Sequence, residues 1–132
     1  GWEKLTTMVT VKAFAPGFFE GCKWIKTNTP PDSLLLSLYG HPTAYNCDRA
    51  QQWETPDKAE ILLTNDERAY DRLKAHGFDY VMVQNFAISQ EPYGQYYPLA
   101  FVQYLSSSTH YQKVYDNSQT YGSSGISLYK VL

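Results

Sequence analysis

The sequence predicts an α/β fold: a small layered sandwich whose mixed sheet has parallel strands, a C-terminal antiparallel pair, and helices on its faces. Two segments carry apolar residues at helical spacing, and a short run rich in β-forming residues follows each of them. Helices and strands that alternate with short loops are typical of layered domains with parallel pairing. The helical segments are 16–28 and 64–77, the strands that follow them are 33–39 and 79–84, and two alternating segments, 112–115 and 126–132, form the closing pair.

The first half of the domain is defined by apolar spacing and by prolines. The first helix must end by Thr29, because the two prolines that follow it disfavour helical geometry and cannot donate backbone hydrogen bonds. Its inner face consists of Phe18, Cys22 and Ile25, at positions i, i+4 and i+7. Residues 33–39 are a short, nearly continuous apolar run, which predicts a buried central strand. After a turn at 40–42, residues 43–47 are predicted as a second, shorter strand.

A capping box marks the start of the second long helix. The Thr64 hydroxyl is expected to accept from the third helical amide, while the Glu67 carboxylate reaches back to the cap. Gly77 supplies the left-handed residue that ends the helix. The preceding segment, 57–63, fits a helical turn and a strand equally well.

The C-terminal third contains a loop, a helix and the closing pair. Residues 86–97 are polar and aromatic and are interrupted by a proline and a glycine, which predicts a long loop. Pro98 suits the first turn of a helix that ends in the serines at 106–108. A loose hairpin connection at 116–125 then joins the two closing strands.

Size and charge exclude several classes of protein. A chain of 132 residues suits one domain, expected over 18–132 and preceded by a tether at 1–17. Eleven basic and thirteen acidic residues give a net charge of −2, without the clustered cations that sequence-independent nucleic-acid binding or a polybasic membrane anchor requires. No apolar run reaches the roughly 18 residues of a membrane span. The common cofactor and hydrolase motifs are missing, so we expect no cofactor.

The two cysteines, Cys22 and Cys47, leave one question open. Their spacing matches no familiar zinc pattern, so we expect no metal site there. A disulfide between them would close a loop of about 25 residues, but only if the fold brings their Cα atoms within about 7 Å.

Two groups of residues are candidates for ligand contact. The first lies near the exit of the first strand, because open α/β sheets tend to bind ligands at the carboxyl ends of their strands. The second is a tyrosine patch with the composition of a sugar- or peptide-stacking platform. The alternatives are a turn held by Asp48 and Arg49 for the first group, and rings that cover a sheet edge or an adjoining domain for the second. The first group is Tyr39, His41, Arg49 and Trp53, and the second is Tyr93, Tyr96 and Tyr97.

An enzymatic function would need a different set of residues. Asp48, Glu54 or Asp57 would have to supply acid/base chemistry. A pair of carboxylates within about 10 Å of each other in a cleft is the geometry that such chemistry requires.

Several stretches follow one another in an order that resembles a known family. Residues 22–33 (CKWIKTNTPPDS), followed by LLLS, resemble the WI-x-x-NTP-x-D element that opens the C-terminal domains of polytopic membrane glycosyltransferases of the GT-C type. Residues 73–83 (LKAHGFDYVMV) are similar to the family's L-K-x-x-G-V-D-Y-V-x-V unit. Residues 112–117 (QKVYDN) and 126–131 (ISLYKV) are similar to its closing hairpin. Together these elements cover most of 18–132.

The resemblance implies a role without catalysis for this chain. The family includes lipid-linked mannosyl and aminoarabinosyl transferases and, more distantly, the oligosaccharyltransferase catalytic subunit. Its acidic catalytic residues lie in loops between transmembrane helices, and none of those loops is in this sequence. Where the oligosaccharyltransferase branch has WWDYG, this chain has Leu38-Tyr39-Gly40-His41, which favours the mannosyltransferase-like branch or another relative.

The leading hypothesis is therefore an extracytoplasmic domain of a membrane glycosyltransferase that uses a polyprenyl-phosphate sugar donor. It would help to position acceptor or donor and would be inactive alone. The resemblance implies that the tether at 1–17 leads from a membrane region. It also implies that the partners are the transmembrane domain of its own parent chain and a glycan or acceptor polypeptide. The alternative is a free-standing carbohydrate- or peptide-binding module.

Overall fold

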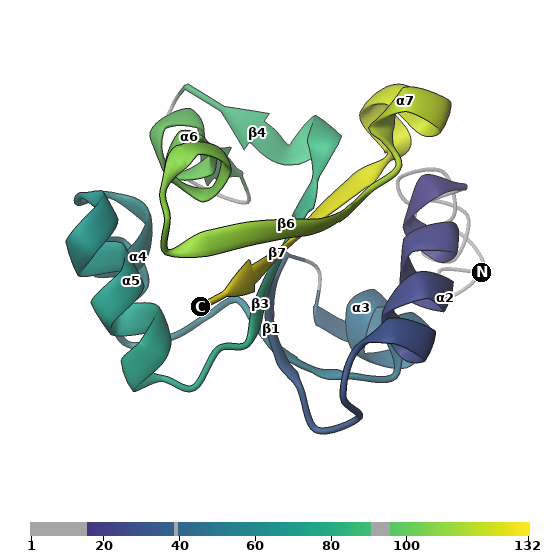
Figure 1. The fold of residues 1–132 in the computed structure, drawn as a ribbon, viewed down its shortest axis with the longest axis horizontal. Helices are drawn as coiled ribbons and strands as arrows, with labels where there is room; N and C mark the ends of the chain where they lie inside the picture. Colours follow the sequence, from purple (N-terminus) through teal and green to yellow (C-terminus); the bar gives the residue numbers. More distant parts are fainter. Residues whose placement is uncertain (1–15, 39, 91–95) are drawn as a thin grey trace, which may run out of the picture.

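A computed structural model describes residues 16–38, 40–90 and 96–132 and has a five-stranded sheet with helices on both faces (Figure 1). The helices are α2 Gly17–Asn28, α3 Gly40–Cys47, α4 Lys58–Leu62, α5 Asp66–Ala75, α6 Leu99–Ser107 and α7 Ser118–Tyr121. The strands of the sheet are β1 Leu34–Ser37, β2 Ala50–Gln52, β3 Tyr80–Gln84, β6 Tyr111–Asp116 and β7 Ile126–Val131. A separate short pair is β4 Ile88–Ser89 with β5 Tyr97–Pro98, and the 3-10 turns are Asn85–Ala87 and Gly122–Ser124.

The sheet confirms the predicted mixed architecture. Its order is β2-β1-β3-β7-β6, with β1 parallel to both of its neighbours and β7 antiparallel to both of its own. The register sets Leu35 beside Gln51 on one side and beside Tyr80 on the other. The closing antiparallel pair, β6 with β7, is present as predicted.

Helices cover the two faces of the sheet in separate layers. In Figure 1, α2 and α3 lie on one side of the sheet, and α4, α5 and α6 lie on the other. Alternate residues of each central strand point to opposite faces, so the sheet separates two apolar clusters. In β3, for example, Val81 and Val83 belong to the cluster under α5 and α6, while Tyr80 and Met82 belong to the cluster under α2.

The two long helices form where the sequence predicts them. In α2 the predicted face of Phe18, Cys22 and Ile25 is at most 1% exposed. The cap of α5 differs from the prediction: Asn65, not Thr64, is the N-cap, and its side chain accepts from the Arg68 amide. The Thr64 hydroxyl instead donates to the carbonyl of Glu60, in α4.

The predicted strand at 43–47 is wrong, because these residues belong to α3. The proline of the Gly40-His41-Pro42 run indicated a turn, but a helix tolerates proline in its first turn, where amides lack intrahelical partners. Thr43 and Cys47, four residues apart, form the buried face of the helix. The second strand is β2, a short edge strand without an apolar residue longer than alanine, so no periodic pattern indicates it.

Three other segments refine the prediction. Residues 57–63, left open between helix and strand, contain α4. The predicted loop at 86–97 contains β4 and the first residue of β5, and its stretch 91–95 lies outside the described residues. The connection between the closing strands holds α7 and a 3-10 turn.

The proposed tether at 1–17 lies outside the described residues except for its end. Gly17 belongs to α2, where its carbonyl accepts from the buried Asn117 side chain, so the domain begins at least one residue earlier than predicted. In the part of the chain that the structure describes, no helix has the length and apolar character needed to cross a membrane.

Candidate functional site

Two residues of the first predicted group, His41 and Trp53, follow the carboxyl ends of β1 and β2, whereas Arg49 directly precedes β2 at its amino end. Tyr39 is outside the described residues, and His41 lies in the first turn of α3. Trp53 follows β2 and is half-buried, with its ring against Tyr97 and under the ammonium group of Lys58. The described members of the group therefore lie at both ends of these strands and do not form one surface.

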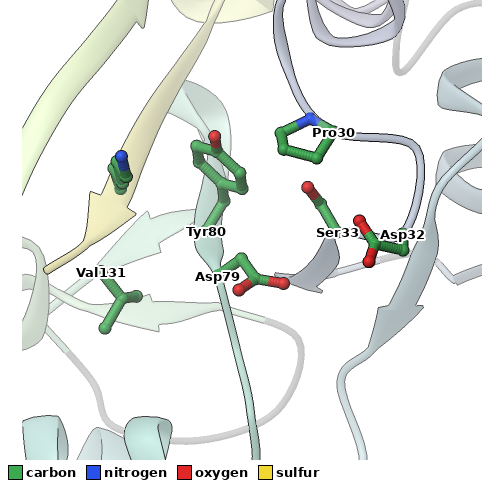
Figure 2. A pocket seen from close by; sticks show the side chains of 7 residues that line it. Pro30, Asp32, Ser33, Asp79, Tyr80 and Val131 are labelled. Atoms are coloured by element: carbon green, nitrogen blue, oxygen red, sulfur yellow. The ribbon is translucent and has the colours of Figure 1, made fainter.

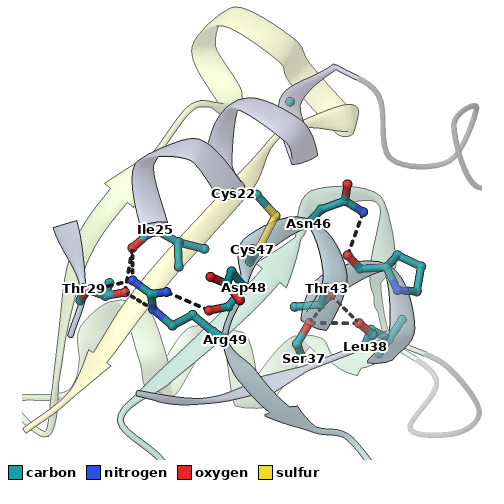
Figure 3. The surroundings of a disulfide bond; sticks show 12 residues. Cys22, Ile25, Thr29, Ser37, Leu38, Thr43, Asn46, Cys47, Asp48 and Arg49 are labelled. Atoms are coloured by element: carbon teal, nitrogen blue, oxygen red, sulfur yellow. Dashed lines mark hydrogen bonds between the residues drawn. A yellow bond between two sulfur atoms is a disulfide. The ribbon is translucent and has the colours of Figure 1, made fainter. Parts of the chain in front are cut away.

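Arg49 is a buried structural residue, which corrects its assignment to a ligand site. It is 7% exposed, and its guanidinium donates to the carbonyls of Ile25, Lys26 and Thr29 at the end of α2. It also donates to the Thr29 hydroxyl and to the carbonyl of Asp48. A cation that caps the last carbonyls of a helix is favourable, because these groups lack intrahelical donors. Figure 3 shows this side chain reaching from the start of β2 to the end of α2.

The two cysteines are bonded to each other, close to Arg49. Cys22 of α2 and Cys47 of α3 form a disulfide, with their Cα atoms 4.3 Å apart. Figure 3 shows the bond linking the two helices on the same face of the sheet. The disulfide and the Arg49 contacts therefore both tie α2 to the α3–β2 segment.

The tyrosine patch is divided between the surface and the core. Tyr93 lies outside the described residues, and Tyr96 is 45% exposed. Tyr97 is fully buried: its ring stacks with Phe101, and its hydroxyl donates to the carbonyls of Leu36 and Met82. Tyr97 is therefore a core residue and cannot stack with a ligand, which corrects its inclusion in the platform.

The carboxyl edge of the parallel strands nevertheless holds a set of buried polar side chains. Gln84, the last residue of β3, is 1% exposed, and both of its amide atoms lack a hydrogen bond among the described residues. The carbonyl oxygen of the Gln51 side chain, in β2, is likewise buried and unpaired within that part of the chain. Ser37, the last residue of β1, shares a hydrogen bond with Thr43 of α3 (Figure 3).

These side chains lie where the chain changes direction. After β1 the chain enters α3, on the α2 face of the sheet, whereas after β3 it enters the 3-10 turn Asn85–Ala87 and β4, on the opposite face. Adjacent parallel strands whose following segments leave toward opposite faces define the switch point at which α/β sheets bind ligands. The Gln84 amide can donate and accept and the Gln51 oxygen can accept, so this edge holds hydrogen-bonding groups of the kind that a neutral polar ligand such as a sugar or a peptide uses.

Sequence reasoning placed the candidate site near the exit of the first strand and did not identify these amides. A usable signal was present, since the apolar runs LLLS and YVMVQ each end in a polar residue at the carboxyl end of a buried strand. Tyr45 of α3 was also missed. It is 87% exposed and is the most exposed large aromatic side chain among the described residues.

A shallow pocket of about 200 Å³ lies at the opposite edge of the sheet (Figure 2). It is lined by Pro30, Asp32, Ser33, Asp79, Tyr80, Lys130 and Val131. Asp79 has a structural task there: its carboxylate accepts from the Leu34 amide, and its own amide donates to the Leu34 carbonyl. Burial raises the pKa of Tyr80, so its phenol stays neutral. The pocket is smaller than the usual ligand cavity of about 300 Å³ or more.

The three carboxylates named for acid/base chemistry have other contacts. The Asp57 carboxylate is hydrogen-bonded to His76 at 2.9 Å, and this bond lowers the pKa of Asp57 and keeps it ionised. Glu54 pairs with Lys58 at 2.8 Å, and Asp48 is exposed at a left-handed position with φ of 52°. None of the three lines the pocket of Figure 2.

No family model matches the sequence, and no curated protein sequence matches it significantly. Among solved structures, the fold is similar to the crystal structure of the C-terminal globular domain of an oligosaccharyltransferase from Archaeoglobus fulgidus, with a TM-score of 0.60 and 14% sequence identity. The match covers 88% of this chain and 97% of that chain. A likeness at this identity establishes a shared fold. The matched structure comes from an oligosaccharyltransferase, the group that the sequence motifs indicated as the more distant relative.

Proposed function

We propose that this chain is an extracytoplasmic domain of a membrane glycosyltransferase that uses a polyprenyl-phosphate sugar donor. In this proposal the domain helps to position acceptor or donor, while transfer takes place in the membrane part of the same parent chain. The observation that carries the proposal is the fold match to an oligosaccharyltransferase C-terminal domain over nearly the whole length of both chains. The ordered sequence elements of such glycosyltransferases, found in the same chain, support it independently.

The disulfide supports the proposed side of the membrane. A bond between Cys22 and Cys47 persists in oxidising compartments, whereas cytosolic thiols are kept reduced. Both cysteines are at most 1% exposed and pack within the apolar cluster under α2, so they have a structural role.

We propose the carboxyl edge of β1, β2 and β3 as the surface that contacts acceptor or donor. The side-chain amide of Gln84 and the side-chain carbonyl oxygen of Gln51 would hydrogen-bond a sugar or peptide, with Tyr39, His41 and the exposed Tyr45 of α3 as further contacts. Trp53 would add to this first group, and Tyr93 and Tyr96, without the buried Tyr97, would form the second patch.

The first test is to read the parent gene upstream of residue 1. Because each membrane span needs roughly 20 apolar residues, a hydropathy profile reveals such spans directly. Several predicted spans before this domain are expected. A parent without them would overturn the membrane proposal and leave the free-standing module, to be tested by titrating the chain with oligosaccharides and peptides.

The second test separates binding from folding at Gln84. Gln84→Met removes two buried unpaired polar atoms, so the free energy of unfolding of the chain should stay the same or increase. In membranes that contain the full-length parent protein, the same change should raise the KM of sugar transfer. Gln103→Met, at an exposed position on α6, is the matched control. Unchanged kinetics in Gln84→Met would rule out this edge as the contact surface.

A further inference from the structure

Three potential metal ligands converge on the far side of the sheet from α2. Asp66 and Glu67 are the first two residues of α5, and His110 lies in the turn before β6. One ligand atom from each lies within 4.8 Å of the others. The fold therefore brings together a carboxylate pair and an imidazole that are 43 residues apart in sequence.

The imidazole of His110 is held in a defined orientation. Its ring stacks on Tyr70 with centroids 3.9 Å apart and planes 9° apart, and its Nε2 lies 2.7 Å from the Glu67 carboxylate. The backbone is fixed as well, because the His110 amide donates to the Ser108 hydroxyl and the His110 carbonyl accepts from the Leu132 amide. Such preorganisation reduces the reorganisation that ligand binding requires.

Two buried polar atoms beside this cluster lack a partner among the described residues. They are the Oδ1 atom of Asp66 and the hydroxyl of Tyr111, a residue that is 6% exposed. The Tyr111 ring packs edge-to-face against both Tyr70 and His110, with ring centroids 6.1 and 6.2 Å away, so this residue lies directly beside the cluster. A buried carboxylate oxygen without a donor is unfavourable, and a bound cation with its water would remove that cost.

The charges around the cluster also suit a cation. In the described part of the chain, neither Asp66 nor Glu67 pairs with a lysine or arginine, and the neighbouring Arg68 pairs with Glu60. The positive end of α5 favours ionised carboxylates, which is the form that binds metal.

We propose that Asp66, Glu67 and His110 bind a divalent transition-metal ion of the Zn²⁺ type. One imidazole and two carboxylates favour such an ion over Ca²⁺ or Mg²⁺, which take oxygen ligands. Water would complete the coordination, within reach of the Tyr111 hydroxyl. The site is separate from the proposed contact surface and does not depend on the proposed function.

The test is a calorimetric titration of the metal-free chain with ZnCl₂, with the imidazole resonances followed by NMR. One equivalent should bind and shift the His110 ring signals, and the melting temperature should rise with the concentration of Zn²⁺. His110→Ala and Glu67→Gln should each weaken binding about tenfold or more, and Tyr111→Phe should weaken it less. His76→Ala is the matched control, because His76 also pairs with a carboxylate but lies at the other end of α5.

The control and the second variant make each outcome decisive. If no saturable binding is seen, or if His76→Ala weakens binding as much as His110→Ala, the site does not exist. Glu67→Gln changes an exposed side chain, so its effect is not confused with unfolding. If excess MgCl₂ or CaCl₂ displaces Zn²⁺, the proposed role of the imidazole is wrong.

Discussion

Arg49 illustrates how a buried charge can serve the fold alone. Its oxygen partners are neutral carbonyls and one hydroxyl, most of them at the end of α2. Arginine suits this place because its planar fork can donate to several acceptors at once, which a lysine ammonium cannot do with the same geometry. The sequence alone offered Arg49 as a ligand-binding cation because its acceptors are backbone groups, which no side-chain pattern reveals.

We therefore expect Arg49→Met to destabilise the chain by about 2 to 4 kcal/mol, because it removes the hydrogen bonds to the buried Thr29 carbonyl and to the Lys26 carbonyl, whereas the Ile25 carbonyl keeps the Thr29 amide as a donor. Arg49→Lys should recover only part of that loss. Urea denaturation under oxidising conditions measures both effects. The control is Arg68→Met, which removes a half-exposed ion pair with Glu60 and should cost less than about 1 kcal/mol. Equal effects at positions 49 and 68 would contradict the assignment.

The lowered pKa of Asp57 predicts how the stability of the chain depends on pH. Its hydrogen bond from His76 lowers the pKa of Asp57 below the unfolded value, and the charges of His76 and Arg72 act in the same direction. A carboxyl whose pKa is lowered by folding adds stability above the unfolded pKa of about 4, and this stability is lost as the pH falls through the folded pKa. Asp57→Asn should therefore be less stable than the parent at neutral pH, and the difference should disappear in acid.

Urea denaturation from pH 7 down to pH 2 would measure this convergence. Asp71→Asn, an exposed position on α5 without an ion pair among the described residues, is the control and should run parallel to the parent. A constant gap between Asp57→Asn and the parent at all pH values would show that the charge of Asp57 makes no contribution.

Elements with a strong apolar period were predictable, and those held by distant contacts were not. The buried face of α2 and the buried strands β1 and β3 can be recognised in the sequence as apolar residues at regular spacing or in a continuous run. By contrast, α3 is a helix of low amphipathicity, held by its disulfide to α2 and by the Ser37–Thr43 hydrogen bond. Neither contact has a local signal. The candidate site follows the same rule: strand order predicts an edge for it, but whether a buried amide there finds a hydrogen-bond partner depends on its three-dimensional surroundings.

The disulfide should make α3 sensitive to reduction. Closing a loop of 25 residues stabilises a chain by about 3 kcal/mol through the entropy of the unfolded state. We expect Cys22→Ala combined with Cys47→Ala, and the reduced parent chain, to lose a similar amount in urea denaturation. Protection of α3 amides from hydrogen exchange should decrease more than that of β3 amides. A double variant as stable as the oxidised parent would contradict this role.

At the scale of the whole molecule, one sheet supports two cores. The cluster under α2 and the cluster under α5 and α6 take alternate residues of the same strands, so Leu35 and Leu36, neighbours in β1, belong to different clusters. Loss of either core would expose one face of the sheet and weaken its hydrogen bonds. The other core depends on the same sheet, so it would be lost as well. Unfolding should therefore be a single cooperative transition, as is usual for a domain of this size.

Two tryptophans allow this prediction to be tested from each face. Trp24 packs against Tyr115 and the cluster under α2, whereas Trp53 packs against Tyr97 and the opposite cluster. In a chain with Trp2→Phe, adding either Trp24→Phe or Trp53→Phe leaves fluorescence from one face. Each chain's fluorescence and far-UV circular dichroism should give coincident urea transitions with equal slopes. If the fluorescence and circular dichroism midpoints differed within either chain, the two layers would unfold independently, and the sheet would not couple them.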